Sequence, residues 1–587
     1  MTFDPYAPRA VDLPTAVPLD GPLDALDDAK ILAAPGDPRD WPAWRDALAR
    51  WRGEARARVQ HDGAAYERPA LEWTQSCFAC ALVWLWDELL YDHDAGRFTP
   101  DRFLDDAERE FGGLDALVLW HAYPVIGIDE RNQFDYYRDA PGIRELVTAI
   151  RARGVRVFVD YNPWDTGTRR EPVSDGESVA AIVRLLGADG VFLDTMKEAM
   201  PDLVAAAADA ALEGEGTVSV PRLRDHHLSW AQWFADSAVP GVLRARWFEQ
   251  RHMLHHTRRW NRDHTEELRS AWLNGVGMLV WENVFGSWVG WSARDRAVLR
   301  GLTAVQRRHV RLLTHGDWTP LAASSDDLRV VGSCWRRGGD ELWALANRTD
   351  EPFRGVVSLA GRPVHLALPA CGFACASRDG VAVFGGGAGE FPERRTVRID
   401  APRVRVRTPP DGFSTAPEPR PLVARFRRRE TGIYGEPAYI GHWKPLPPYL
   451  HDLVDVARPA PSGRFAIARR EVTGADGTPL TGLSLAEARG FAAAAGARLP
   501  TEDEWQLAAE AGMLERVRPL VWNWTESEHR DGRTRFAILK GGSEWRAEGS
   551  DWYVDGGPKE PSFSLQLLLA GPLQRSSRIG FRLAVDL

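Results

Sequence analysis

From residue 72 to residue 315, short apolar runs alternate with amphipathic helical segments. The runs are FACALVWLW (78–86), LDALVLWHAYP (114–124), VRVFVDYNPWD (155–165), ADGVFLDTM (188–196), GTVSVP (216–221), VPGVLRARWFEQ (239–250) and VGMLVWENVFG (276–286). Continuous apolar strands that alternate with helices are typical of a parallel sheet covered on both faces. Seven strands without a glycine-rich phosphate loop after the first favour a closed (β/α)8 barrel over a doubly wound sheet. The eighth strand is then VRLLTHG (310–316) or a segment that this pattern does not reveal.

The chain of 587 residues is too long for one hydrophobic core, so we expect several domains. Residues 1–71 are predicted as an N-terminal leader and helix, and residues 72–317 as the barrel. Short alternating runs such as LRVVGSCWRR and DELWALANRT predict an antiparallel β-sandwich, which with its linker occupies residues 318–422. Residues 423–587 differ in character and are predicted as a separate α+β domain.

Composition narrows the choice of partners. The net charge of −9 is mild for this length, which argues against nucleic acid or a membrane as the partner. The N-terminus lacks the apolar core of a signal peptide, and no apolar stretch is long enough to span a bilayer, so we expect a cytoplasmic protein, with secretion left open. The 25 Trp residues suit a protein that stacks sugar rings on indole faces. A homodimer is a further expectation.

Acidic and aromatic residues gather at the ends of the apolar runs, where a (β/α)8 barrel carries its catalytic groups. Hydrolysis of a glycosidic bond needs two carboxyl groups that flank the scissile bond, and it needs no cofactor or metal ion. Asp194 is our first choice as nucleophile or base, and Glu282 or Glu249 as the general acid/base. A helix N-cap is the structural alternative for Asp194, and an arginine ion pair for Glu282. The predicted substrate contacts are Asp160, Tyr161, Trp164, Trp86, Trp120, His121, Tyr123, Trp281 and Asn283.

Two further groups of residues are given structural roles. Cys77 and Cys80 form a CxxC inside an apolar run, and we expect packing thiols there and no metal site. His252 and His256 have i, i+4 spacing without an HExxH motif, so a polar helix face is expected.

Part of the barrel resembles a known group. The segment GADGVFLD (187–194) is similar to the fourth strand of α-galactosidase-type retaining glycosidases, in which the Asp that ends this strand is the nucleophile. VRVFVDYNPWD (155–165) is similar to their third strand, whose Asp and aromatic residue hold the sugar. The resemblance implies a glycosidase with Asp194 as nucleophile. It also implies an acid/base at the end of the sixth strand, where the sequence places Glu249.

The C-terminal region resembles the sulfatase-modifying-factor family, which includes formylglycine-generating enzymes. The motifs are FAIARREVT (465–473), TGLSLAEA (481–488), GARLPTEDEWQ (496–506), VWNWTES (521–527), ILKGGSEW (538–545) and RIGFRLA (578–584). The resemblance implies a C-type-lectin-like fold. Formylglycine-generating enzymes bind copper through two cysteines, and this sequence has no Cys after Cys375. We therefore expect a domain that is not catalytic itself and that packs on the barrel, binds glycan or closes the active site from the side.

Three functions follow in order of preference. The first is a glycoside hydrolase that cleaves an oligo- or polysaccharide. The second is a non-catalytic glycan-binding protein on a degenerate barrel, in which Asp194 and Glu282 would be bound in arginine salt bridges away from a common pocket. The third is a nonheme metal oxidase that works through the C-terminal domain.

Overall fold

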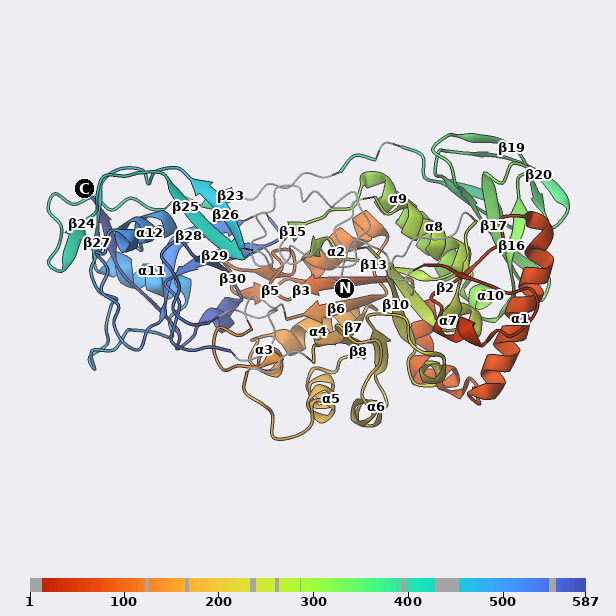
Figure 1. Ribbon diagram of the computed structural model, residues 1–587, viewed down its shortest axis with the longest axis horizontal. Coiled ribbons are helices and arrows are strands. Elements are labelled where there is room, and N and C mark those ends of the chain that lie inside the picture. Colours follow the sequence, from red (N-terminus) through yellow and green to blue (C-terminus); the bar gives the residue numbers. More distant parts are fainter. Residues whose placement is uncertain are drawn as a thin grey trace.

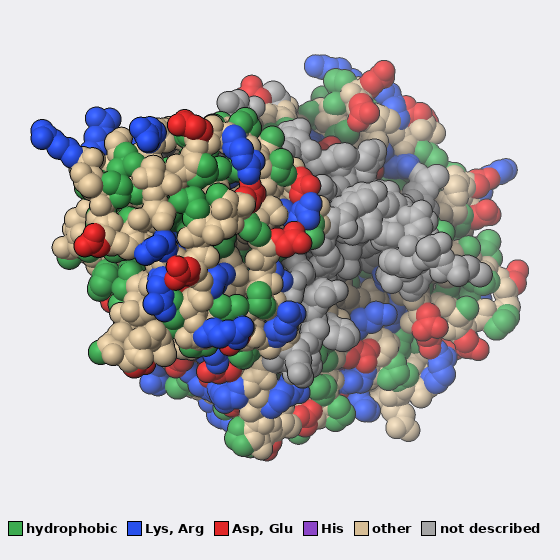
Figure 2. Space-filling model, turned by 60° about the vertical axis from the view of Figure 1, so that its left-hand side comes forward, with side chains coloured by type: hydrophobic (Ala, Val, Ile, Leu, Met, Phe, Trp, Pro, Cys, Tyr) green, Lys and Arg blue, Asp and Glu red, His purple; other side chains and the backbone are tan. Residues whose placement is uncertain are grey.

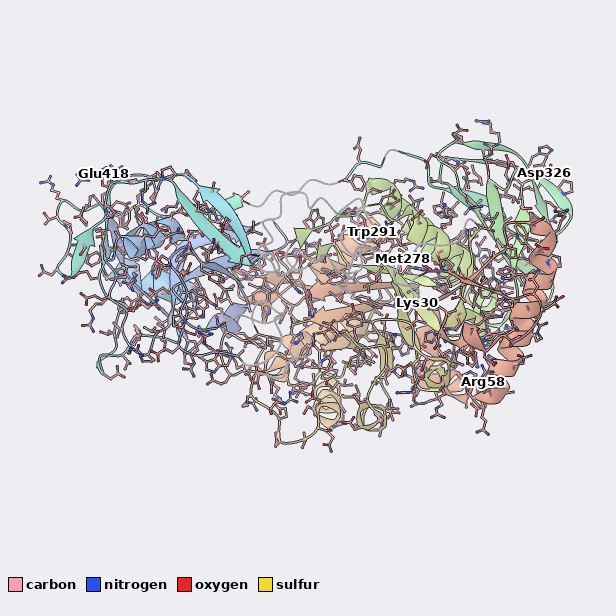
Figure 3. All side chains as sticks on the ribbon, viewed as in Figure 1. Lys30, Arg58, Met278, Trp291, Asp326 and Glu418 are labelled. Carbon is pink, nitrogen blue, oxygen red and sulfur yellow. The ribbon has the colours of Figure 1, made fainter. Side chains whose placement is uncertain are left out.

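The computed structural model describes residues 13–121, 126–163, 168–232, 239–258, 263–284, 287–387, 389–391, 397–399, 401–427, 453–530, 532–547 and 556–587. A barrel lies at the centre of the molecule, between an antiparallel sheet on the right and the C-terminal domain on the left (Figure 1). Met278 marks the barrel, and Asp326 and Glu418 mark the two far ends (Figure 3).

Eight parallel strands close the barrel, which confirms the predicted (β/α)8 fold. Each strand pairs with the strands that precede and follow it along the barrel, and the last pairs with the first. The strands are β3 (Ala79–Trp84), β6 (Ala116–Trp120), β7 (Arg156–Tyr161), β8 (Gly190–Leu193), β9 (Ala211–Gly214), β10 (Leu228–Gln232), β12 (Met253–Thr257) and β13 (Gly277–Val280).

Helices surround the barrel strands. They are α2 (Pro100–Phe111), α3 (Gln133–Arg138), α4 (Ile143–Ala152), α5 (Asp175–Leu186), α6 (Pro201–Ala206), α7 (Arg244–Phe248), α8 (Thr265–Asn274), α9 (Ala293–Arg308) and α10 (Val310–His315). The longer ones are amphipathic, and α5 and α9 begin with a side-chain N-cap. In α5, for example, Ser174 and Glu177 form a capping box, and Gly187 ends the helix in the left-handed conformation.

Strands five to seven of the barrel differ from the prediction. The fifth strand is β9, which we predicted as the end of a helix, and the sixth is β10, which the pattern did not reveal. The seventh is β12, so His255 and His256 lie on a strand and not on a polar helix face. These strands carry Glu, Ser and His in buried positions, and a search for apolar runs therefore misses them.

Three apolar runs that we predicted as barrel strands are not strands of the barrel. Residues 216–221 form no strand and lead into a 3-10 helix (Val220–Arg224). Residues 239–250 contain β11 (Val242–Leu243) and α7, and β11 pairs with β2 (Ile31–Ala33) outside the barrel. Residues 310–315 form α10, so the predicted eighth strand is a helix, and the eighth strand is β13.

The N-terminal region packs against the barrel. Helix α1 (Trp41–Arg58) buries Trp44 and Trp51 completely, and the indole N–H of Trp247 donates to the carbonyl oxygen of Leu48 at 2.9 Å. Strand β2 also pairs with β1 (Thr15–Ala16). Two small hairpins, β4 (Tyr91–Asp92) with β5 (Arg97–Phe98) and β14 (Asn283–Val284) with β15 (Ser287–Trp288), extend the loops that follow β3 and β13.

Residues 317–384 form a seven-stranded antiparallel sheet in the order β20-β19-β16-β17-β18-β21-β22. The strands are β16 (Asp317–Ser324), β17 (Val330–Arg337), β18 (Asp340–Asn347), β19 (Phe353–Leu359), β20 (Arg362–Leu368), β21 (Phe373–Ser377) and β22 (Gly380–Phe384). Trp318 stacks on Trp335 at 5.6 Å and meets Trp247 at 5.2 Å, which joins this sheet to the barrel side of the molecule.

The C-terminal domain combines two helices with short sheets. Its elements are β23 (Val397–Ile399), β24 (Phe413–Thr415), β25 (Leu422–Arg427), β26 (Leu453–Arg458), β27 (Phe465–Ala468), α11 (Leu485–Ala494), α12 (Glu502–Glu510), β28 (Trp522–Arg530), β29 (Arg535–Lys540), β30 (Ser564–Leu568), β31 (Ile579–Phe581) and β32 (Ala584–Asp586). Buried Arg498, from the GARLPTEDEW motif, pairs with Glu504 at 2.7 Å and with Asp586 at 2.8 Å. The motif residues thus hold the domain together.

The surface is mixed in charge. On the face shown in Figure 2, Lys and Arg side chains are interspersed with Asp and Glu, so charge of one sign does not gather there in a large patch. In the part of the chain that the structure describes, no helix has the length and apolar character needed to cross a membrane.

Candidate active site

Three neighbouring strands bring polar side chains together at their carboxyl ends. Leu193 on β8 pairs in register with Tyr161 on β7 and with Gly214 on β9. The next residues on these strands are Asn162, Asp194 and Glu215, which we call the upper row. Register partners in parallel strands point to the same face of the sheet, so these three side chains project together at the mouth of the barrel.

Direct contacts join the upper row. The amide nitrogen Nδ2 of Asn162 lies 3.3 Å from Oδ2 of Asp194. The backbone N–H of Thr195 donates to Oε2 of Glu215 at 2.5 Å. Asp194 and Glu215 are both partly exposed. The contact with the Thr195 N–H places the Glu215 carboxylate beside the backbone of the loop that begins at Asp194.

The backbone beside Asp194 is strained. Thr195 has a φ of 62°, in the left-handed region that a β-branched residue rarely adopts. Such conformations persist where the surrounding structure enforces them, and they cluster at functional sites. Here the hydrogen bond from the Thr195 N–H to Glu215 is one of the enforcing contacts.

Asp160 and His121 form a buried pair below the upper row. Asp160 is two residues before Asn162 on β7, on the same face, and Nδ1 of His121 lies 3.2 Å from its Oδ2. Oδ1 of Asp160 has no hydrogen-bond partner among the described residues. Burial raises the pKa of the Asp160 carboxyl, the nearby His121 acts against this, and the charge of Glu215 raises it further. Asp160 is therefore a buried acid whose Oδ1 has no partner within the described part of the chain.

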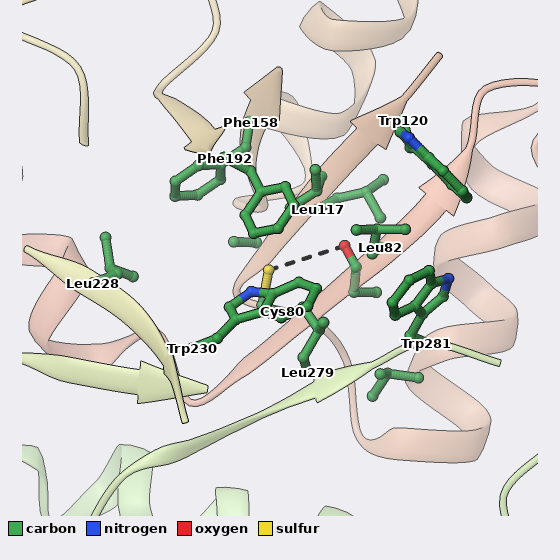
Figure 4. Close-up of a cluster of buried hydrophobic side chains, with 14 of the residues drawn as sticks. Cys80, Leu82, Leu117, Trp120, Phe158, Phe192, Leu228, Trp230, Leu279 and Trp281 are labelled. Carbon is green, nitrogen blue, oxygen red and sulfur yellow. Dashed lines mark hydrogen bonds between the residues drawn. The ribbon is translucent and has the colours of Figure 1, made fainter. Parts of the chain in front are cut away.

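Aromatic rings fill the barrel beneath these polar groups. Phe192, two residues before Asp194, stacks on Trp230 at 4.6 Å, and Trp281 contacts both Trp230 and Trp120 at 6.0 and 5.9 Å. Figure 4 shows this cluster inside the barrel. Trp120 and Trp281, which we predicted as sugar contacts, are thus part of the buried floor of the site.

Three other predicted substrate contacts have structural partners elsewhere in the protein. Trp86 is fully buried and packs against Tyr91 and Phe98. Tyr161 points to the helical layer, where its hydroxyl donates to Asp175 at 2.8 Å. The amide of Asn283 bonds to Thr534 of the C-terminal domain. Tyr123 and Trp164 lie outside the described residues.

Glu282 follows β13, but its carboxylate does not join the upper row. Trp281 points into the barrel, and the next residue, Glu282, faces the outer layer, where Arg296 donates to it at 2.6 Å and the N–H of Trp291 at 3.1 Å. The structure therefore gives Glu282 the arginine ion pair that was its structural alternative.

Glu249 lies at the other end of the barrel. It comes just before β12, and parallel strands begin at the end opposite the mouth. Its carboxylate binds Arg251 at 2.8 Å, His61 at 3.0 Å and Arg56 at 3.2 Å. Burial acts to raise its pKa, but hydrogen bonds from His61 and Arg251 hold the pKa of Glu249 far below its ordinary value. The structure does not bring Glu249 together with Asp194, because the run 239–250 is not a barrel strand.

Glu215 is the residue that the sequence analysis missed. It follows the four-residue strand ALEG (211–214), which we predicted as the end of a helix. Reading ALEG as a strand would have placed Glu215 at a strand end, directly beside Asp194.

Among the described residues, Cys80, Glu213 and His255 are a group that could hold a metal ion, since their donor atoms lie within 4.8 Å of one another. Both nitrogens of His255 already have partners. Nε2 lies 2.7 Å from the carbonyl oxygen of Cys77 and donates to it, and Nδ1 lies 2.5 Å from Oε1 of Glu213. Because Nε2 carries a proton, a second proton must lie between Nδ1 and Glu213. Both ring nitrogens of His255 therefore have partners, whereas Oε2 of Glu213 has no hydrogen-bond partner among the described residues.

Comparison with known protein families supports the C-terminal resemblance. Residues 442–519 match the Sulfatase-modifying factor enzyme 1-like domain family. This match lies in the C-terminal domain and covers only a small part of the chain. A search of curated proteins finds no match to the whole sequence.

Solved structures with related barrels include several glycoside hydrolases. The debranching enzyme of Nostoc punctiforme is 11% identical, with a TM-score of 0.35 over 54% of this chain and 99% of its own. A cyclic alpha-maltosyl-(1→6)-maltose hydrolase of Arthrobacter globiformis is 12% identical, with a TM-score of 0.33 over 52% of this chain and 99% of its own. An alpha-amylase of Lactobacillus plantarum is 11% identical, with a TM-score of 0.33 over 54% and 98%. Likenesses this weak carry no information on the reaction of this chain.

Proposed function

We propose that this protein is a glycoside hydrolase that cleaves O-glycosidic bonds with Asp194 and Glu215 as its two carboxylates. The observation that carries the proposal is the position of these acids, side by side at the carboxyl ends of β8 and β9. Glycoside hydrolysis needs such a pair and no cofactor.

The arrangement favours a retaining mechanism. Neighbouring strands of a sheet are about 4.8 Å apart, which is close to the separation of about 5 Å that retaining enzymes need and shorter than inverting enzymes use. Asp194, held by the Asn162 amide, is the nucleophile that attacks the anomeric carbon. Glu215 gives a proton to the leaving oxygen and then takes one from the attacking water.

Asp160 and His121 serve substrate binding in this proposal. The free Oδ1 of Asp160 accepts a hydrogen bond from a sugar hydroxyl, and His121 holds the Asp160 carboxylate in place. The Trp floor keeps water from the site from below and strengthens the electrostatic interactions within it.

Hydrolysis assays on a panel of aryl glycosides and oligosaccharides test the proposal, with NMR to follow the anomeric configuration of the product. We expect retention of configuration, and a loss of at least about a thousandfold in kcat for Asp194→Asn and for Glu215→Gln. Glu249→Gln is the control at the other end of the barrel and should keep its kcat where it remains folded. Equal losses in all three variants would contradict the assignment.

Two further measurements distinguish the hydrolase from the alternative functions. Glycan binding by isothermal titration without hydrolysis of any panel member would favour a glycan-binding protein on a degenerate barrel. Stoichiometric copper or iron in the purified protein would favour the metal oxidase.

A further inference from the structure

Arg533 of the C-terminal domain packs against the barrel loops that follow β3 and β13. It lies in the turn between β28 and β29, and only 8% of its side chain is exposed. Its Nε lies 2.9 Å from each oxygen of Asp87, and its Nη1 lies 3.7 Å from Glu282. Its guanidinium also covers the ring of Trp288 at 5.1 Å. One arginine from the C-terminal domain is therefore bound by three residues of the barrel loops.

The two carboxylates form a socket that requires a cation. Asp87 and Glu282 follow β3 and β13, which are neighbouring strands of the barrel, and both side chains are almost completely buried. Buried carboxylates are stable only when they are paired. Glu282 forms an ion pair with Arg296 of the barrel itself, whereas the ion-pair partner of Asp87 comes from the C-terminal domain.

Backbone and side-chain contacts extend the interface around this socket. The N–H of Glu88 donates to the carbonyl oxygen of Arg533 at 2.9 Å. Ser576 donates to Asp129 at 2.7 Å, and Arg131 donates to the carbonyl oxygen of Leu573 at 2.9 Å. These barrel residues belong to the loops after β3 and β6, so the C-terminal domain holds loops on one side of the mouth.

The apolar core continues across the interface. Phe536 on β29 meets Trp84 on β3 at 6.0 Å, and the buried residues of the barrel form a single cluster with Trp522, Trp524 and Leu567 of the C-terminal domain. A domain attached in this way is not an independent module on a linker.

We propose that the C-terminal domain is a fixed wall of the active-site mouth, locked by Arg533, and that this wall restricts cleavage to the ends of sugar chains. The wall stands over the loops after β13, β3 and β6, and Asp194 and Glu215 follow β8 and β9 on the far side of the barrel. A sugar chain between the acids can extend away from the wall but meets it in the other direction. Arg533 is a positioning residue here. The proposed restriction of cleavage to chain ends rests on the proposed hydrolase function.

The test compares the full-length protein with Arg533→Met and, as a matched control, Arg530→Met. Arg530 also pairs with a barrel acid, Glu88 at 2.7 Å, but its side chain is 46% exposed. By differential scanning calorimetry we expect one unfolding transition for the wild type and for Arg530→Met, and a separate earlier transition for Arg533→Met. Hydrolysis should fall about a hundredfold in Arg533→Met and less than about fivefold in Arg530→Met.

Two further variants keep the proposal falsifiable if Arg533→Met does not fold. Arg533→Lys keeps the charge and should retain the single transition, and Asp87→Asn combined with Arg533→Met should restore part of the stability, because the unpaired carboxylate is gone. Unchanged calorimetry in Arg533→Met would overturn the lock, whether or not the protein hydrolyses sugars. Release of internal fragments from a polysaccharide blocked at both ends would overturn the restriction to chain ends. If the wild type hydrolyses no substrate and Arg533→Met no longer shows the single transition of the wild type, the hydrolase function is overturned and the lock is supported.

Discussion

Glu213 and Glu215 lie on the same face of β9, two residues apart, in opposite surroundings. Glu215 is partly exposed at the mouth, where its carboxylate binds the Thr195 N–H. Glu213 is fully buried inside the barrel, and its Oε1 lies 2.5 Å from Nδ1 of His255. In our proposal the same residue type serves chemistry at position 215 and stability at position 213, and the depth in the barrel decides which.

Glu213→Gln tests the stabilising role. Burial lowers the pKa of His255, but the charge of Glu213, the hydrogen bond to Glu213 and the hydrogen bond to the Cys77 carbonyl together outweigh burial, and the pKa is raised overall. A histidine with a raised pKa contributes its full stability below its ordinary pKa of about 6.5, and this contribution is lost as the pH rises through the raised value. We expect Glu213→Gln to lower the free energy of unfolding by about 3 kcal/mol at about pH 6, and by less at about pH 9. Guanidinium titrations at the two pH values measure this, and a loss that grows with pH would contradict it.

At the scale of elements, the sequence predicted the barrel strands that are continuous apolar runs and missed those that are not. FACALVWLW, VRVFVDYN and GVFLD read clearly as strands, and with them Asp160 and Asp194 were predicted at strand ends. ALEG, LSWAQ and MLHHT carry buried polar residues whose partners come from other strands, such as His255 for Glu213. Periodicity along the chain cannot reveal such partners, so Glu215 was missed together with its strand.

The close approach of β9 to the loop after β8 gives a prediction about one glycine. A Cβ at Gly214 would collide with the carbonyl oxygen of Lys197, and that loop also holds Thr195 and Asp194. We expect Gly214→Ala to lower the free energy of unfolding by about 1–3 kcal/mol and hydrolysis by at least about tenfold. Gly216→Ala is the matched control, because its Cβ would meet only the Lys197 side chain at 3.4 Å. Kinetics and thermal unfolding of both variants check this, and equal effects would count against it.

At the scale of the whole molecule, the barrel shares its apolar core with both neighbours. Trp335 and Leu342 of the antiparallel sheet and Trp522 of the C-terminal domain belong to the same buried cluster as the barrel strands. From the excess of Trp in the composition we predicted stacking against sugar rings. Much of that excess instead packs in the core that joins the domains. Trp44, Trp51 and Trp335, for example, are fully buried away from the mouth.

Trp335→Ala measures the strength of the sheet–barrel contact. The side chain is completely buried and stacks on Trp318, so its removal leaves a large cavity. We expect the free energy of unfolding to fall by about 3–5 kcal/mol. Val381→Ala, on the exposed edge of the same sheet, should change it by less than about 0.5 kcal/mol. Denaturant titration of the two variants distinguishes these outcomes, and a small effect of Trp335→Ala would show that the sheet is only loosely attached.

The socket of Asp87 and Glu282 also has a consequence for the order in which the protein is made. The ribosome completes every barrel strand before it reaches Arg533, and domains generally fold in the order of their synthesis. A nascent barrel therefore has Asp87 without its arginine until Arg533, within the C-terminal domain, has emerged. Chains whose synthesis stops before Arg533 leave the Asp87 carboxylate and the residues around Trp84 exposed. Proteases and chaperones can recognise such chains by this exposed surface.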